Sequence, residues 1–167
     1  MNNNDLLIRL RYALDIKNKD MIEIFKLGGM EVTKEELLMM LTKTDDSIDE
    51  EELAEQEDHI KVDHVMWETF LNGFIIFKRG KQEPKPGQPQ TPEPSKENPK
   101  NLLLKKVKIA LSMTSDDMLD TFAAAGFTVS KAETGALMRK EGHKNYKECG
   151  DQIARNFLKG LGMKYRK

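Results

Sequence analysis

Apolar residues recur three and four positions apart in eight stretches of the sequence, four on each side of a proline-rich segment. This spacing is typical of the buried face of an α-helix. In the first and fifth stretches the apolar face is formed by Leu6, Leu7, Leu10 and Leu14, and by Leu103, Leu104, Val107 and Leu111. The pattern predicts an all-α fold.

Local signals mark where several of these helices begin and end. The second helix of each half is predicted to start at Asn18 or Ser115, since both residues suit an N-cap. The third is predicted to start with capping boxes at residues 33–36 and 130–133, where a hydroxyl and a carboxylate satisfy opposing backbone N–H groups. Similar boundaries in both halves indicate a shared ancestry.

The two halves are copies of one unit. Residues 4–43 align without a gap on residues 101–140, with 13 identical pairs in 40 positions. A second block aligns residues 70–79 on residues 157–166, so the first copy holds ten extra residues. These extra residues fall in an acidic run, 45–58, where Ser47–Glu50 is predicted to start a short helix. The sequence therefore predicts two homologous four-helix units arising from internal duplication.

Two glycines occupy the same point of the fourth helix, Gly73 in the first copy and Gly160 in the second. Glycine inside a helix costs about 1 kcal/mol relative to alanine. A residue without a side chain at both points is best explained by a close crossing of two helices. The prediction is structural, not a ligand site.

The predicted domains are 1–80, the first helical repeat with its insertion at 45–58, and 102–167, the second helical repeat. Residues 81–101 between them contain all six prolines, and the stretch from 78 to 101 has no aliphatic or aromatic side chain. Such a segment buries too little apolar area to offset the entropy of ordering it, so it is predicted to be a disordered linker. Because units of this size are close to the lower limit for independent stability, we expect the repeats to pack together with pseudo-two-fold symmetry.

The net charge of −1 conceals an asymmetry between the repeats. Residues 1–80 carry 10 Lys and Arg against 18 Asp and Glu, whereas residues 102–167 carry 13 against 7. One interpretation is that the opposite charges steer the two repeats together. The other is that the basic repeat contacts an external anion such as nucleic acid, through Lys105, Lys106, Lys108, Lys164, Arg166 and Lys167.

Sequence motifs for chemistry are scarce. The nucleotide-binding loop patterns are missing, and the acidic run lacks the glycine and the ligand spacing of an EF-hand. His59 and His64 are five residues apart, which is unsuited to a zinc pair on one helix face. We therefore predict no catalytic residue, no cofactor-binding residue and no metal ligand.

One segment of the second repeat concentrates reactive side chains just before the fourth helix. It contains His143, Asn145, Tyr146, Cys149 and Asp151. A thiol near a helix N-terminus can have a lowered pKa, so the segment is a candidate partner site, ligand site or thiol-based site. The structural alternative is a small buried cysteine, with Asp151 capping the helix and Tyr146 filling a gap.

Several sequence features concern location. No apolar run approaches the ~20 residues of a membrane span. The first five residues lack the basic and apolar regions of a secretory signal, and a single cysteine excludes an internal disulfide framework. We therefore expect a cytoplasmic protein that does not contact a membrane.

Three motifs resemble the YehS-like family of bacterial proteins along essentially the whole chain. They are Asn4-Asp5-Leu6-Leu7 with Arg9-x-Arg11-Tyr12-Ala13-Leu14, then Phe70-Leu71-Asn72-Gly73 with Lys78-Arg79-Gly80-Lys81, and His143-Lys144-Asn145-Tyr146 with Glu148-Cys149-Gly150-Asp151-Gln152. The resemblance implies a bacterial cytosolic protein with a twofold-repeated domain. It implies no activity, cofactor or catalytic residue.

These features together favour a non-catalytic helical interaction module that binds another macromolecule, with a protein partner favoured. A nucleic-acid-binding protein that uses the basic repeat is one alternative, and a small-ligand or thiol-based site around residues 143–151 is another. The sequence leaves enzymatic activity, the identity of the partner and the oligomeric state open.

Overall fold

The computed structural model describes residues 1–42, 60–80, 97–139 and 142–165, which form helices joined by loops. The all-α prediction is therefore confirmed. The helices of the first repeat are α1 (Asn3–Ala13), α2 (Asn18–Gly28), α3 (Lys34–Met40) and α5 (His64–Arg79), and those of the second are α6 (Pro99–Ala110), α7 (Ser115–Ala124), α8 (Lys131–Leu137) and α9 (Asp151–Tyr165). The predicted short helix at 47–50 and residues 81–96 of the predicted linker lie outside the described residues.

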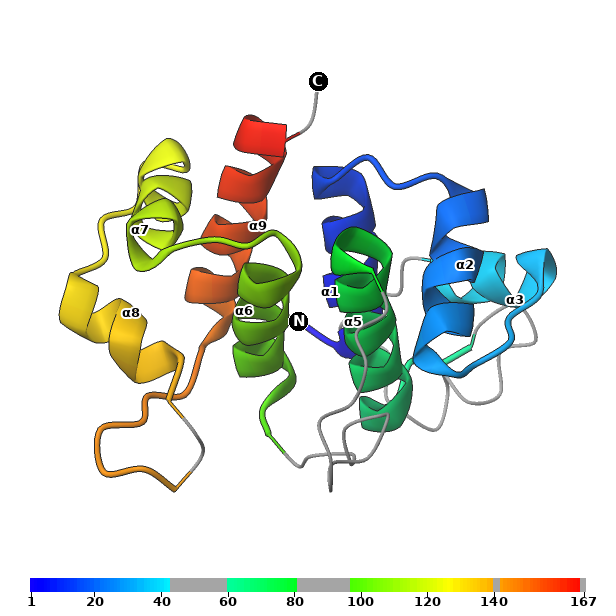
Figure 1. Ribbon diagram of the computed structural model, residues 1–167, viewed down its shortest axis with the longest axis horizontal. Coiled ribbons are helices and arrows are strands. Elements are labelled where there is room, and N and C mark those ends of the chain that lie inside the picture. The colour runs from blue at the N-terminus through cyan, green and yellow to red at the C-terminus, as the bar shows by residue number, and fades with distance from the viewer. Residues whose placement is uncertain (43–59, 81–96, 140–141, 166–167) are drawn as a thin grey trace.

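Four helices, α1, α5, α6 and α9, form the centre of the molecule and run in the same direction (Figure 1). The amine of Met1 lies 3.0 Å from a carboxylate oxygen of Asp151, which joins the start of α1 to the start of α9. Near the other end of the same two helices, a Cβ built on Gly162 would lie 3.6 Å from Cα of Ala13. These two contacts show that α1 and α9 are parallel neighbours.

The two repeats pack reciprocally. The first helix of each repeat packs more extensively on the fourth helix of the other repeat than on its own, so that α1 contacts α9 and α6 contacts α5. In the second of these pairs, Trp67 donates a hydrogen bond from Nε1 to the carbonyl oxygen of Pro99 at 3.0 Å. The remaining helices flank this centre, α2 and α3 on one side and α7 and α8 on the other (Figure 1). In the expected pseudo-two-fold packing, the first helix of each repeat therefore lies against the fourth helix of the other repeat.

Equivalent aromatic residues occupy equivalent places in the two halves of the core. The ring centroids of Phe25 and Phe70 are 5.0 Å apart in the first repeat, and those of Phe122 and Phe157 are 5.7 Å apart in the second. All four rings have no exposed surface. The side chains that the sequence alignment pairs are therefore also paired in space, which supports the internal duplication.

The two fourth-helix glycines lie where α5 and α9 cross the second helix of their own repeat. A Cβ on Gly73 would lie 1.8 Å from the carbonyl oxygen of Ile24, and a Cβ on Gly160 would lie 1.8 Å from that of Thr121. Ile24 and Thr121 are equivalent in the repeat alignment. Both glycines thus permit the close helix crossing that the sequence predicts.

Two helix starts differ from the predicted ones, and one predicted capping box is incomplete. The N-caps of α2 and α7 are Lys17 and Thr114, one residue before the predicted caps. Asn18 instead accepts a hydrogen bond from Arg11 at 2.7 Å, which ties α2 to α1. The hydroxyl of Ser130 caps α8, but the reciprocal half of its predicted box is missing because the carboxylate of Glu133 pairs with Lys147.

The last difference at a helix start is α6, which begins at Pro99, inside the range predicted as linker. Asn98 provides the cap, since its side-chain oxygen accepts a hydrogen bond from the N–H of Lys100 at 2.9 Å. Proline suits the first helical position because its fixed φ is helical and its missing N–H has no helical partner there. The last proline of the proline-rich segment is therefore the first residue of α6.

The negative charge of the first repeat resides in one segment. Within the described part of residues 1–80, nine Lys and Arg balance nine Asp and Glu, whereas residues 45–58 hold nine Asp and Glu and no Lys or Arg. The central helices that join the repeats contribute buried apolar side chains, among them Leu10, Phe74 and Leu103. Burial of these apolar side chains therefore stabilises the packing of the two repeats.

Candidate functional site

The candidate segment around residues 143–151 forms the loop between α8 and the start of α9. Residues 147–151 of this loop are fixed at both ends. The N–H of Lys147 donates to the carbonyl oxygen of Ala136 in α8 at 3.0 Å, and Asp151 is the first residue of α9. His143, Asn145 and Tyr146 precede this fixed part, and Cys149 lies within it. The segment thus has an exposed part, with His143, Asn145 and the half-buried Tyr146, and an inner part, with the buried Cys149 and the half-buried Asp151.

Cys149 lies in the buried part, held by the side chain of Asn101. Asn101 accepts a hydrogen bond from the N–H of Cys149 at 2.8 Å and donates to the carbonyl oxygens of Leu137 and Lys147 at 3.0 and 2.9 Å. The Asn101 side chain has no exposed surface. One asparagine therefore joins the start of α6, the end of α8 and the loop before α9.

The first repeat contains the same arrangement around Asn4. Asn4 accepts from the N–H of Val62 at 3.0 Å and donates to the carbonyl oxygens of Met40 and Ile60 at 2.9 and 2.8 Å. We call these two arrangements the asparagine clamps. The clamps were not predicted from the sequence, although a polar residue that is identical in both copies and adjacent to the apolar face of the first helix is a usable signal.

The clamps define the structural role of Cys149, because it takes the place that Val62 takes in the first repeat. The Cys149 residue is 1% exposed, and burial raises the pKa of its thiol to about 12. The thiol is therefore protonated at neutral pH, whereas attack on an electrophile requires the thiolate. These observations support the structural alternative for Cys149.

Replacing Cys149 with valine is expected to change the free energy of unfolding by less than about 1.5 kcal/mol, the range for volume-conserving apolar exchanges. The equivalent position already accommodates Val62. Urea denaturation followed by circular dichroism measures the difference. Cys149→Asp serves as the contrasting variant, since a buried carboxylate is strongly unfavourable. Rapid alkylation of native wild-type protein by iodoacetamide would contradict the burial of this thiol.

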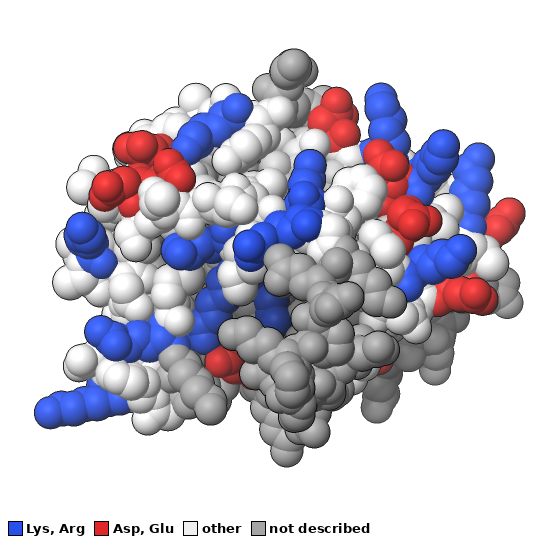
Figure 2. Space-filling view, viewed as in Figure 1, with Lys and Arg blue, Asp and Glu red and all other residues white. Residues whose placement is uncertain are grey.

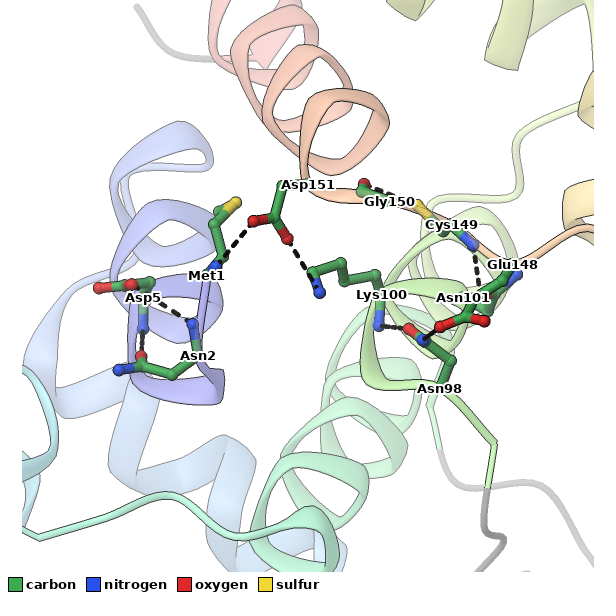
Figure 3. A network of polar contacts seen from close by, with 10 residues as sticks. All are labelled: Met1, Asn2, Asp5, Asn98, Lys100, Asn101, Glu148, Cys149, Gly150 and Asp151. Carbon is green, nitrogen blue, oxygen red and sulfur yellow. Dashed lines mark hydrogen bonds and ion pairs between the residues drawn. The ribbon is translucent and has the colours of Figure 1, made fainter. Parts of the chain in front are cut away.

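Asp151 joins two other elements at the start of α9 (Figure 3). Its carboxylate accepts from the ammonium group of Lys100 at 2.9 Å and from the amine of Met1 at 3.0 Å. These hydrogen bonds, the one from Lys100 first, lower the pKa of Asp151 to about 2. Because negative charge near a helix N-terminus is also favourable, Asp151 acts as a junction between α1, α6 and α9.

The exposed part of the loop forms one wall of an open concavity of about 680 Å³, which we call the α8 groove. Its other wall is α8. The groove is lined by Lys131, Ala132, Glu133, Gly135, Ala136, Arg139, Asn145, Tyr146 and Lys147. Asn145 and Tyr146 therefore share a surface, whereas His143, Cys149 and Asp151 do not line it.

The predicted anion contacts that the structure describes differ in their surroundings. Lys105 forms an ion pair with Glu97 at 2.9 Å, and its side chain is only 15% exposed. Burial lowers the pKa of Lys106, which faces Glu68. Lys108 and Lys164 lie in the last turns of α6 and α9, where a cation complements the helix dipole. Arg166 and Lys167 lie outside the described residues.

A second surface was not found from the sequence. Among the described residues, Tyr12 and Met163 are the most exposed of the large apolar side chains, at 63% and 62%. The contact between Ala13 and Gly162 places them at the same level of two parallel helices, and helical geometry directs both to the same side. Arg9, Arg155 and Lys159 are exposed on that side too. We call these five residues the α1–α9 face.

Two kinds of feature are missing from the described ranges. No cluster of three or more His, Cys, Asp or Glu side chains suited to a metal ion occurs among those residues. Within the same ranges, no helix combines the length and apolar character needed to span a bilayer.

In its described residues, the molecule is an all-helical protein in which one four-helix unit occurs twice, and each unit carries an asparagine clamp and a glycine crossing. The chain belongs to the family described as Protein of unknown function (DUF1456), whose model matches residues 3–80 and 100–167. These segments correspond to the two repeats. The resemblance to the YehS-like family is therefore confirmed.

A bacterial relative matches almost the whole chain. The chain is 38% identical over 161 residues to Uncharacterized protein YehS of Escherichia coli (strain K12), covering 96% of this chain and 94% of the relative. No solved structure matches significantly.

Proposed function

We propose that the protein is a non-catalytic interaction module that binds another protein through the α1–α9 face. The observation that carries the proposal is the exposure of Tyr12 and Met163, side by side, on a surface to which both repeats contribute. Tyrosine, methionine and arginine are enriched at protein interfaces relative to the rest of a protein surface. Methionine also adapts its shape to different partners.

The charges around this pair favour a partner with acidic groups. Arg9, Arg155 and Lys159 are exposed beside the two apolar side chains. In such an interface the central apolar side chains contribute most of the affinity, and the cations around them contribute mainly to partner selection and association rate. A bacterial protein that presents an apolar anchor flanked by carboxylates would match this face.

The proposal is tested by affinity capture from lysate of the native bacterial host, followed by mass spectrometry. Tyr12→Ser/Met163→Ser is the test variant, and Leu38→Ser/Val65→Ser is the matched control. Leu38 and Val65 are 48% and 54% exposed but lie outside the α1–α9 face. Replacing exposed side chains changes stability by only about 0.5 kcal/mol, so both variants should fold.

We expect a protein that is captured by the wild type and by the control variant but lost with the test variant. Nuclease treatment of the lysate separates this result from the nucleic-acid alternative. Equal capture by all three forms, or capture that disappears with nuclease, would contradict the proposal.

A further inference from the structure

The α8 groove and the acidic segment 45–58 belong to corresponding connections in the chain order of the two repeats. The groove lies between α8 and the loop that leads to α9. The acidic segment connects α3 to α5, the equivalent helices of the first repeat. Figure 1 shows α3 and α8 at opposite ends of the long axis. Each molecule thus has an acidic segment attached at one end and a groove at the other.

Three cations at the groove form no ion pair with another described residue. Lys131 and Arg139 line it, Lys144 lies on the same loop, and all three are exposed. Glu133 is the groove's acidic residue, and its carboxylate is already paired with Lys147. Figure 2 shows Lys and Arg side chains over α8 and the following loop, at the lower left. The groove therefore presents a local positive potential.

The floor of the groove allows a second chain to approach closely. Ala132, Gly135 and Ala136 form it, and a Cβ added at Gly135 would meet no atom within 4 Å. Tyr146 is half-buried at the side of the groove. Small residues leave room for the backbone of a bound segment, and the cations around them match carboxylates.

We propose that the α8 groove of one molecule binds the acidic segment 45–58 of a second copy. The segment holds nine Asp and Glu and no Lys or Arg, which makes it complementary to the groove. Because segment and groove are attached at opposite ends of each molecule, two antiparallel copies place each segment against the other copy's groove. Both contacts then form at once in a closed dimer with two-fold symmetry. This association does not use the α1–α9 face, so the two proposals fail separately.

Sedimentation velocity of the full-length protein, from about 1 µM to about 500 µM, covers the range of weak complexes. We expect a monomer–dimer equilibrium at about 50 mM salt that shifts to monomer at about 500 mM, because salt screens exposed charges. The groove variant Lys131→Glu/Arg139→Glu should weaken dimerisation at least about tenfold, corresponding to about 1.4 kcal/mol. The control variant Lys17→Glu/Lys19→Glu makes the same charge change on exposed residues outside the groove and should dimerise like the wild type.

A charge-swap experiment assigns the partner surface. The segment variant Glu50→Lys/Glu51→Lys/Glu52→Lys should also be monomeric when alone. Mixed with the groove variant, it should form a heterodimer, since each altered surface then faces an opposite charge in the other molecule. Circular dichroism checks that both variants are folded.

A heterodimer in the mixture, with both variants monomeric alone, supports the proposal. A wild-type protein that is monomeric at every concentration at low salt overturns it. Dimerisation that the groove variant leaves unchanged also overturns it, as does a mixture of folded variants that stays monomeric.

Discussion

Alanine in place of Gly73 is expected to lower the free energy of unfolding by roughly 3–5 kcal/mol, which is exceptional for the addition of one methyl group. The added Cβ would lie 1.8 Å from the carbonyl oxygen of Ile24 and 2.9 Å from the backbone nitrogen of Gly28. Both atoms belong to the α2 backbone, so no side chain can rotate away. The helices must separate, and the core around Phe25 and Phe70 loses its packing.

Two further glycine variants provide the comparison. Gly160→Ala should have a similar effect, because its Cβ would lie 1.8 Å from the carbonyl oxygen of Thr121. Gly135→Ala should be neutral or stabilising by up to about 1 kcal/mol, since Gly135 is helical with open space around it. Urea denaturation monitored by circular dichroism measures all three. If Gly73→Ala and Gly160→Ala change the free energy of unfolding as little as Gly135→Ala does, the close helix crossings at Gly73 and Gly160 are contradicted.

Removing the side chain of Asn101 is expected to cost about 3 kcal/mol or more. Asn101→Ala leaves three backbone groups of Leu137, Lys147 and Cys149 without their partner. A buried polar group that loses its hydrogen bond costs about 1–3 kcal/mol. The same denaturation experiment measures the loss, and we expect the loop before α9 to lose protection from hydrogen exchange.

Asn4→Ala should cost about as much as Asn101→Ala, because Asn4 makes the same three kinds of hydrogen bond in the first repeat. Asn156→Ala is the control. Its amide donates one exposed hydrogen bond to Gln152, so its removal should change stability by less than about 0.5 kcal/mol. A clamp variant no less stable than this control would contradict the role assigned to the clamps.

The repeat alignment predicted those parts of the fold that depend on local sequence. Helical spacing located the helices, and the matched glycines Gly73 and Gly160 indicated the close crossings, because only a backbone contact requires a missing side chain at the same point twice. The capping box at Thr33 and Glu36 is present with both of its hydrogen bonds. The helices and the capping box share one property, which is that their physical cause lies within a few residues of the pattern, whereas the glycines were informative because they recur in both copies.

Features that depend on long-range contacts could not be obtained in this way. The sequence predicted that the repeats pack together, but not that each first helix packs on the other repeat's fourth helix, since several pairings bury the same apolar faces. The sequence made Cys149 a candidate reactive thiol, whereas the clamps show that it takes the buried position that Val62 takes in the first repeat. Tyr12 and Met163 lie 151 positions apart in the sequence, and only the pairing of α1 with α9 makes them neighbours.

The reciprocal pairing of first and fourth helices is the central claim, and an engineered disulfide between α1 and α9 tests it most directly. A Cβ on Gly162 would lie 3.8 Å from Cβ of Ala13, which is an ordinary Cβ separation for a disulfide bond. In Ala13→Cys/Gly162→Cys we expect a disulfide within one chain, detected by mass spectrometry and non-reducing electrophoresis and independent of protein concentration. In the control variant Ala13→Cys/Gly135→Cys, the two cysteines lie on α1 and α8, and both should remain free thiols. Free thiols in the first variant, or disulfides only between chains, would contradict the pairing.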